Sequence, residues 1–280
     1  MARETTNSPL TTHLLTTHSY SPMSVIVKKN LPSGTIILNR PEKRNALSRQ
    51  MLEDLAQAFD DLHQERRVRG VILTGAGSVF CAGMDLAEMQ ETANQPDALM
   101  QWHDDAVQYR ELIDKMLQFP KPIIAAVNGP AVAGGAGLLL ASDLVVAAPE
   151  AKFGLPEPRR GIVAGMVAPL LVFRVGGSYA ASLLLTGRMI EPAEAQRIGL
   201  YHEVVKSDLV WARSQEIASE IAHSAPEAIQ LTKKLLNETI GEHLGTQLSA
   251  GAAASATART TEAAREGLAA FLEKREPKWP

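Results

Sequence analysis

The strongest constraint on the fold is a pattern that occurs twice: a short apolar strand that runs into a glycine-rich turn. The first copy reads VILTGAGSVFCAGMDL over residues 71–86, and the second reads IIAAVNGPAVAGGAGLLL over residues 123–140. Apolar strands that alternate with helices are typical of α/β proteins, whose sheets are covered on both faces. The two copies indicate an internal repeat of ββα units. Neither has the glycine spacing and following acid of a Rossmann dinucleotide site.

Size and composition allow a large core and exclude several functions. The chain has 280 residues, 45% of them hydrophobic, enough for one domain with an appendage or for two small domains. A formal net charge of −3 predicts no nucleic-acid partner. The single cysteine, Cys81, excludes an intrachain disulfide framework and fits a reducing compartment, so we expect a cytoplasmic protein with Cys81 buried in a turn. Without a run of about 18 apolar residues, no membrane span is predicted.

Three regions are expected along the chain. Residues 1–22 are rich in Thr, Ser and His, so we expect a disordered extension, with Met23 as a candidate start. Strands and helices alternate over residues 23–206, where 165–174 and 178–185 are predicted as separate helices and the segment after Leu86 is polar and poorly patterned. Only helical patterns follow over residues 207–280.

The two glycine turns predict an oxyanion site. A glycine-rich turn that opens a helix presents free backbone N–H groups to an anion. If the fold brings the turns together, the N–H groups of Met84 and Gly134 converge on one oxygen and stabilise a thioester enolate or a tetrahedral oxyanion. The alternative is that the glycines only permit tight turns.

Glu157, in the sequence FGLPE, is the candidate base. It follows the second glycine turn in an apolar setting, and desolvation there would raise its pKa toward neutrality. We expect its surroundings to include Phe153, Pro156, Ile162, Val163 and Leu138. The alternative is an acid in a surface turn.

Six segments in the expected order resemble the crotonase superfamily, the enoyl-CoA hydratase/isomerase family. They span about residues 24 to 278 and read NRPEKRNALS, TGAGSVFCAGMDL, KPIIAAVNGPAVAGGAGLLLASD, FGLPE, LLLTGRMIEPAEAQRIGL and EGLAAFLEKREP. The resemblance implies a ClpP-like spiral of ββα units carrying the acyl-CoA site over residues 23–206. It also implies a C-terminal helical region, residues 207–280, that builds homotrimers or homohexamers.

The resemblance also implies the site residues. Met84 and Gly134 match the oxyanion-hole positions, and Glu157 matches an acidic position. Lys274 and Arg275 could reach the CoA phosphates of a neighbouring subunit. Binding of the CoA and acyl groups is implied at a larger set of positions: Arg44, Ala46, Leu47, Ala82, Gly83, Asp85, Leu86, Val132, Gly135, Gly137, Pro156 and Gly165.

Gly137 stands where the hydratases of this family carry a second acid. Two carboxylates hold the water that adds to a double bond, whereas one carboxylate suffices to move a proton between the α- and γ-carbons. The sequence therefore favours isomerisation of 3-enoyl-CoA to 2-enoyl-CoA with Glu157 as the sole acid and base. The alternatives are an enoyl-CoA hydratase and a non-catalytic acyl-CoA-binding protein, with thioester hydrolysis and decarboxylation also open.

Other positions complete the expectations. Asp104, Asp105 or Glu111 could replace the missing acid, although each fits a solvated helix charge better. The acyl-pocket wall or the core is expected to take Met84, Met89, Trp102, Met116 and Met166. The seven histidines show no metal-ligand spacing, so no metal is predicted, and no cofactor beyond the coenzyme A of the substrate.

Overall fold

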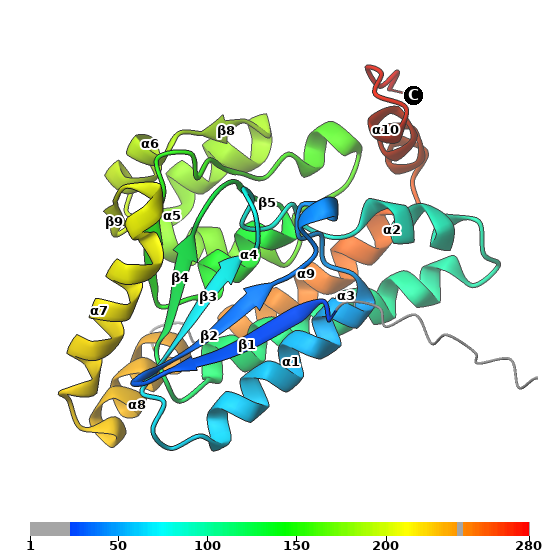
Figure 1. The fold of residues 1–280 in the computed structure, drawn as a ribbon. Coiled ribbons are helices and arrows are strands. Elements are labelled where there is room, and N and C mark those ends of the chain that lie inside the picture. The colour runs from blue at the N-terminus through cyan, green and yellow to red at the C-terminus, as the bar shows by residue number, and fades with distance from the viewer. Residues whose placement is uncertain (1–22, 240–242, 280) are drawn as a thin grey trace, which may run out of the picture.

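The fold is built on a six-stranded sheet with a smaller sheet beside it (Figure 1). The computed structural model describes residues 23–239 and 243–279, so the extension predicted for residues 1–22 lies outside the described residues. The large sheet has the order β1-β2-β3-β4-β6-β9 and is parallel except for the β1–β2 hairpin. Its strands are β1 Val25–Asn30, β2 Ser33–Leu38, β3 Gly70–Gly75, β4 Ile123–Val127, β6 Leu144–Ala147 and β9 Glu203–Val204.

The small sheet is formed by chain segments that leave the large one. Its three strands are β5 Ala131–Val132, β7 Phe153–Gly154 and β8 Met189–Ile190. Isolated bridges extend it, joining Cys81 to Ala131 and Leu47 to Met84. The two predicted glycine turns are therefore tied to each other by backbone pairing, as the repeat of ββα units requires.

Helices cover the sheets and form the C-terminal part of the chain. The α-helices are α1 Arg49–Gln64, α2 Leu86–Ala93, α3 Ala98–Gln118, α4 Gly134–Ala141, α5 Val167–Thr186, α6 Pro192–Arg197, α7 Val210–Ala222, α8 Pro226–Lys234, α9 Leu244–Ala258 and α10 Glu262–Leu272. Shorter helical turns are η1 Pro41–Lys43, η2 Glu157–Arg160, η3 Ser207–Leu209 and the π-helical η4 Leu235–Thr239.

Helix α1 shows how local sequence places the core. The Ser48 hydroxyl accepts a hydrogen bond from the Met51 N–H at 3.2 Å, which caps the helix. The apolar face of the helix is buried, with Leu52, Leu55 and Phe59 at most 1% exposed. Each such side chain stabilises the fold by roughly 1.5–3 kcal/mol relative to leaving it in water.

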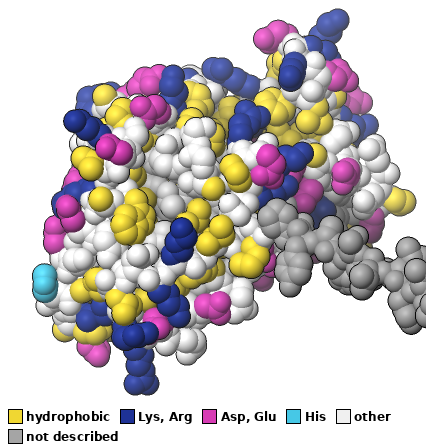
Figure 2. Space-filling model, in the orientation of Figure 1, with side chains coloured by type: hydrophobic (Ala, Val, Ile, Leu, Met, Phe, Trp, Pro, Cys, Tyr) yellow, Lys and Arg dark blue, Asp and Glu magenta, His cyan; other side chains and the backbone are white. Residues whose placement is uncertain are grey.

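Some C-terminal helices pack on the large sheet, and others pack on the helices around η2 and α3. Helix α7 packs on β3 and β4, and α9 packs on α3 and α5. Helix α10 stands at the edge of the molecule in Figure 1, and its main packing partners are η2 and α2. The face drawn in Figure 2 carries acidic and basic side chains side by side, without a continuous basic patch.

Of two secondary-structure expectations, one was incomplete and one is confirmed. The polar segment after Leu86 forms helix α2, because the Asp85 carboxylate caps it by accepting from the Ala87 N–H at 3.1 Å. The two helices expected over 165–174 and 178–185 are confirmed, because α5 is kinked at Gly176, whose non-helical backbone (φ 76°, ψ 162°) separates them.

Helix α5 also bears on the membrane expectation. Its 20 residues have a mean hydropathy of 1.5 over an 18-residue window, which by length and composition alone suffices to cross a membrane. Only 28% of that window is buried. The same helix packs on α4, α9 and η2, and core helices of soluble proteins pass this test too. The absence of a membrane partner therefore stays a prediction.

Candidate active site

The two glycine turns meet at the mouth of one pocket. A carbon atom added to the Cα of Gly134 would lie 3.6 Å from the Met84 amide nitrogen, and one added to Gly83 would lie 3.2 Å from the Gly134 amide nitrogen. Among the backbone hydrogen bonds of the described residues, none is donated by Met84 or Gly134, whereas the Asp85 N–H bonds to the Leu47 carbonyl. The two free N–H groups thus lie close together, as predicted for an oxyanion site.

Backbone strain sets the second of these donors. Ala133, at the N-terminus of α4, has φ 52° and ψ −123°, a conformation that normally requires glycine. As the first residue of α4, Gly134 has no intrahelical partner for its N–H, and the conformation of Ala133 sets the direction of that group. The cost is offset by packing, since all eight residues of α4 are buried.

The first turn is fixed by a residue that the sequence analysis missed. Asn45 is fully buried with φ 53°, and its Nδ2 group donates to the carbonyl oxygens of Ala76, Val79 and Phe80. The signal in the sequence is an asparagine within a polar loop, because asparagine tolerates the left-handed backbone conformation.

Cys81 is buried in the same turn, as predicted. Burial raises the pKa of its thiol to about 12, and its Sγ donates to the Asn45 carbonyl at 3.1 Å. A thiol of this kind is no nucleophile at neutral pH.

Replacing Gly83 with alanine is expected to lower kcat by about 10²-fold or more, as loss of one oxyanion donor does. Gly83 has φ 93°, and a methyl group there would lie 2.8 Å from the Ala133 side chain and 3.0 Å from the Val132 carbonyl. Relief of these contacts moves the Met84 amide. The matched control is Gly245→Ala on α9, where nothing lies within 4 Å. Steady-state kinetics with thermal melting checks the pair, and equal kcat values for both variants would contradict the assignment.

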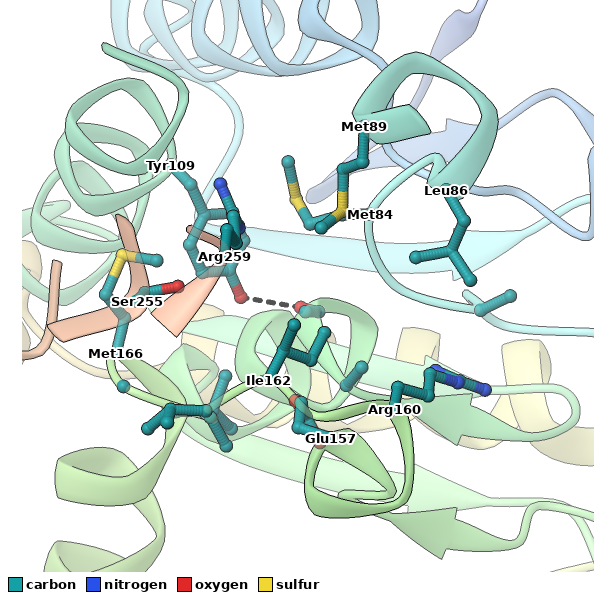
Figure 3. Close-up of a pocket in the computed structure, with 17 residues that line it drawn as sticks. Met84, Leu86, Met89, Tyr109, Glu157, Arg160, Ile162, Met166, Ser255 and Arg259 are labelled. Carbon is teal, nitrogen blue, oxygen red and sulfur yellow. Dashed lines mark hydrogen bonds between the residues drawn. The ribbon is translucent and has the colours of Figure 1, made fainter. Parts of the chain in front are cut away.

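Glu157 lies in the pocket as the candidate base (Figure 3). It begins η2, is 5% exposed, and its Oε2 atom has no hydrogen-bond partner among the described residues. Desolvation raises its pKa to about 7, while its own backbone N–H and the nearby Arg160 charge oppose that shift. A carboxyl group with such a pKa can both take up and return a proton near neutral pH.

The wall of the pocket is mostly apolar and comes from five parts of the chain. Ten predicted residues line it: Ala82, Met84, Leu86, Met89, Gly134, Glu157, Ile162, Val163, Gly165 and Met166. The other lining residues are Tyr109, Ala133, Arg160, Ala164, Val167, Ser255 and Arg259. Three other residues expected to surround Glu157, Phe153, Pro156 and Leu138, are not among the lining residues, and Met116 is a core residue at 0% exposed.

Tyr109 occupies the place that a side chain at Gly137 would take. A carbon atom added to the Cα of Gly137 would lie 2.0 Å from the Tyr109 hydroxyl oxygen. That hydroxyl donates to the Gly134 carbonyl at 2.6 Å, drawn as the dashed line in Figure 3. Gly137 is itself buried behind Tyr109. Tyr109 could not be recognised from the sequence, because its position on the apolar face of α3 is typical of a core residue.

The acids proposed as substitutes for the missing carboxylate do not reach the pocket. Asp104 and Glu111 are exposed, and Glu111 borders a different surface hollow. Asp105 is buried, but both of its oxygens accept from Arg49, at 2.6 and 2.8 Å. Glu157 is the only carboxylate that lines the pocket among the described residues.

The segments predicted to hold CoA lie together. The Ala82 N–H donates to the Arg44 carbonyl at 3.1 Å, and the Leu47 N–H to the Gly83 carbonyl at 2.8 Å. Arg40, which the sequence analysis missed, bridges them by donating to the Asp85 carboxylate at 2.9 Å and to the Ala46 carbonyl at 2.7 Å.

The remaining predicted site residues pack around these turns. Val132 donates its N–H to the Cys81 carbonyl, Gly135 packs against Cys81, Gly165 packs against Gly251, and Pro156 precedes η2. Arg275 pairs with Glu266 and Glu273 in this chain, while Lys274 is exposed. No group of three or more His, Cys, Asp or Glu side chains within residues 23–239 and 243–279 is placed to hold a metal ion.

Comparison with known proteins identifies the family. A family model described as enoyl-CoA hydratase/isomerase matches residues 33–280. The chain belongs to this family, and so to the crotonase superfamily. It is 42% identical over 246 residues to a "Putative enoyl-CoA hydratase" of Thermus thermophilus, covering 88% of this chain and 96% of that protein. It is 35% identical over 254 residues to the "2,3-dehydroadipyl-CoA hydratase" of Escherichia coli, covering 90% and 97%.

Solved structures agree with the assignment of the fold. The enoyl-CoA hydratase/isomerase of Xanthobacter autotrophicus has a TM-score of 0.82 at 30% identity, covering 92% of this chain and 98% of that one. The enoyl-CoA hydratase of Bacillus anthracis has a TM-score of 0.72 at 35% identity, covering 91% and 98%. The predicted crotonase fold is confirmed, and with it membership of an enzyme family that acts on enoyl-CoA thioesters.

Proposed function

We propose that this member of the enoyl-CoA hydratase/isomerase family moves a double bond, converting a 3-enoyl-CoA to the 2-enoyl-CoA with Glu157 as its single acid and base. The observation that carries the proposal is the occupied second-acid position, where Tyr109 fills the space beside Gly137 and leaves Glu157 as the only carboxylate in the described pocket. A lone carboxylate can move a proton but cannot hold water from two sides.

The proposed reaction has two proton transfers. The Glu157 carboxylate takes a proton from the α-carbon, and the C–H electrons pass through the carbonyl to form a dienolate. Its oxygen accepts hydrogen bonds from the Met84 and Gly134 N–H groups, whose contribution increases as charge develops there. Glu157 then returns the proton to the γ-carbon, which leaves the conjugated double bond between the α- and β-carbons. Its pKa near 7 supports both transfers.

The product distinguishes isomerisation from hydration. We expect incubation with a 3-enoyl-CoA to give a product of unchanged mass with the absorbance of a conjugated thioester. Incubation with a 2-enoyl-CoA should add no water at a comparable rate. Rapid gain of the mass of water from the 2-enoyl-CoA would overturn the proposal, and binding of CoA without turnover of either thioester would favour a non-catalytic binding protein.

An enoyl-CoA hydratase is the second candidate, because the relative at 42% identity is named a putative enoyl-CoA hydratase and the one at 35% a 2,3-dehydroadipyl-CoA hydratase. The Tyr109 hydroxyl supports it chemically, since it donates to the Gly134 carbonyl and keeps a lone pair that can accept a hydrogen bond from water. In this scheme Glu157 would remove the proton of the water that Tyr109 holds.

We also propose that the protein is cytoplasmic and needs no cofactor beyond the CoA of its substrate.

The active protein is proposed to be a homotrimer or homohexamer. Helix α5 leaves Val172, Tyr179 and Leu185 exposed at 43%, 41% and 82%, an apolar surface suited to contact between copies. Light scattering after size exclusion should give three or six times the chain mass, and a monomer would refute the proposal.

A further inference from the structure

Arg259 is a buried cation in the pocket without a matching anion. It ends α9, is 7% exposed, and lines the pocket that contains Glu157. Within the described residues, the only hydrogen bond of its guanidinium joins Nη1 to the Trp102 carbonyl at 3.5 Å, and its buried Nε has no partner. Desolvation lowers its pKa, which shows how poorly the charge is compensated. A buried charge of this kind is costly unless a ligand pairs with it.

The nearby carboxylate does not compensate Arg259. Asp105 acts on it through space, but the Asp105 oxygens already accept two hydrogen bonds from Arg49 and one from Gln101. The Arg49–Asp105 pair is neutral as a unit. Glu88 likewise accepts from the Arg49 N–H, at 3.1 Å, and not from Arg259. No ion pair of the described residues includes Arg259, so no carboxylate there bonds directly to its guanidinium.

A second unpartnered donor lies next to Arg259. The indole Nε1 of Trp102 is buried without a hydrogen-bond partner, and Trp102 and Arg259 line the same small side cavity. That cavity shares Met89, Ile162 and Arg259 with the main pocket, so the two adjoin, and helices α2 and α10 line its other side. Buried polar groups are rarely left unpaired, and here both orphan groups are donors, which call for an acceptor.

The cationic group on the other side of the pocket serves a different part of the ligand. Arg160 stacks on Phe271 at 4.3 Å and is influenced by the charge of Arg44, which belongs to the predicted CoA segment. Figure 3 shows Arg160 on one side of Ile162 and Arg259, with Ser255, on the other. CoA phosphates therefore suit the Arg160 side, and the acyl group extends toward Arg259.

We propose that the acyl group of the substrate ends in a carboxylate, which Arg259 binds together with the Trp102 indole N–H. The substrate class is then the CoA monothioester of an unsaturated dicarboxylic acid. A guanidinium presents parallel N–H groups that match the two oxygens of a carboxylate. The inference rests on the proposed function only in that the pocket receives an acyl-CoA thioester.

The test uses a matched pair of unreactive ligands, hexanoyl-CoA and the CoA monothioester of adipic acid, which differ only at the remote end. By calorimetry the wild-type protein should bind the carboxylate-ended ligand at least about tenfold more tightly, as a charged hydrogen bond predicts. Arg259→Met should lose that preference while hexanoyl-CoA binds as well or better. Arg259→Lys should keep part of it. The exposed Arg66→Met is the matched control and should behave as wild type.

Melting of the ligand-free protein separates binding from a structural role. Removing an uncompensated buried charge should leave the melting temperature of Arg259→Met unchanged or raise it. A wild-type protein without preference, or an Arg259→Met variant that melts lower and binds both ligands equally weakly, would overturn the inference. Because neither ligand can react, binding is measured apart from catalysis. A preference for the carboxylate-ended ligand in a protein that does not isomerise a 3-enoyl-CoA would refute only the proposed reaction. Isomerisation of a 3-enoyl-CoA by a protein without that preference would refute only the carboxylate site.

Discussion

Glu157→Gln is expected to lower kcat/KM for a 3-enoyl-CoA by about 10²–10⁴-fold, the range for removal of a general acid–base group. Glutamine keeps the shape of the side chain but cannot take up the α-proton. The oxyanion donors belong to the backbone of Met84 and Gly134 and are unaffected, so substrate binding should change little. The matched control is Glu53→Gln, an exposed glutamate on α1. Turnover above a tenth of wild type would contradict the role of Glu157.

The pH dependence follows from the same group. Glu157 must be ionised to act as the base, and its pKa is raised to about 7. Activity should therefore rise with pH through an ascending limb near pH 7, rather than near the ordinary glutamate pKa of about 4.3. A profile of kcat/KM between pH 5 and 9 reports this ionisation in the free enzyme. An ascending limb below pH 5 would show that Glu157 is not desolvated as the structure indicates.

The stability of the fold should show the reverse trend. Because the folded-state pKa of Glu157 lies above its unfolded value, the folded protein binds the proton more tightly, and the free energy of unfolding falls as pH rises from about 4.5 to 7. At pH 8 the raised pKa lowers the free energy of unfolding by about 3 kcal/mol. Glu157→Gln should therefore be more stable than wild type at pH 8, by urea unfolding, and less so at pH 5. If the difference in free energy of unfolding between Glu157→Gln and wild type were the same at pH 5 and pH 8, the raised pKa of Glu157 would be contradicted.

The candidate site residues that lie in local sequence patterns could be predicted from the sequence. Glycine turns and the FGLPE segment are continuous in the chain, so Met84, Gly134 and Glu157 could be assigned before the fold was known. The helix caps Ser48 and Asp85 are local in the same sense, since a cap is defined within four residues. The order of strands and helices likewise predicted a repeated ββα architecture.

The residues that were missed act across the chain. Tyr109 lies 25 residues before the Gly134 carbonyl that it contacts, and on α3 its spacing is that of a core residue. Arg259 ends a helix far from Glu157, and only the fold shows that it enters the same pocket without a carboxylate partner. Arg259 is identified by the carboxylate partner that it lacks, and Tyr109 by the side chain that it excludes at position 137. Periodicity and spacing in the sequence do not encode either property.

Gly137→Glu tests whether Tyr109 closes the second-acid position, and alone it is expected to lower the free energy of unfolding by more than about 3 kcal/mol. The new Cβ would lie 2.0 Å from the Tyr109 hydroxyl oxygen and 3.2 Å from its Cζ. Overpacking of this kind costs roughly 1–3 kcal/mol, and a carboxylate buried without a partner adds to that. Urea unfolding measures the loss, and stability equal to wild type would refute the steric assignment.

Tyr109→Ala supplies the space that the new carboxylate needs. By itself it should destabilise the protein by about 3–5 kcal/mol through the cavity it leaves. The double variant Gly137→Glu/Tyr109→Ala should lose less stability than the sum of the two single changes, because the glutamate fills that cavity. Such non-additivity is expected only for residues in contact. If the double variant also adds water to a 2-enoyl-CoA faster than wild type does, then Tyr109 is what separates one-acid isomerisation from two-acid hydration. Additive losses of stability would show that Tyr109 and position 137 do not compete for the same space.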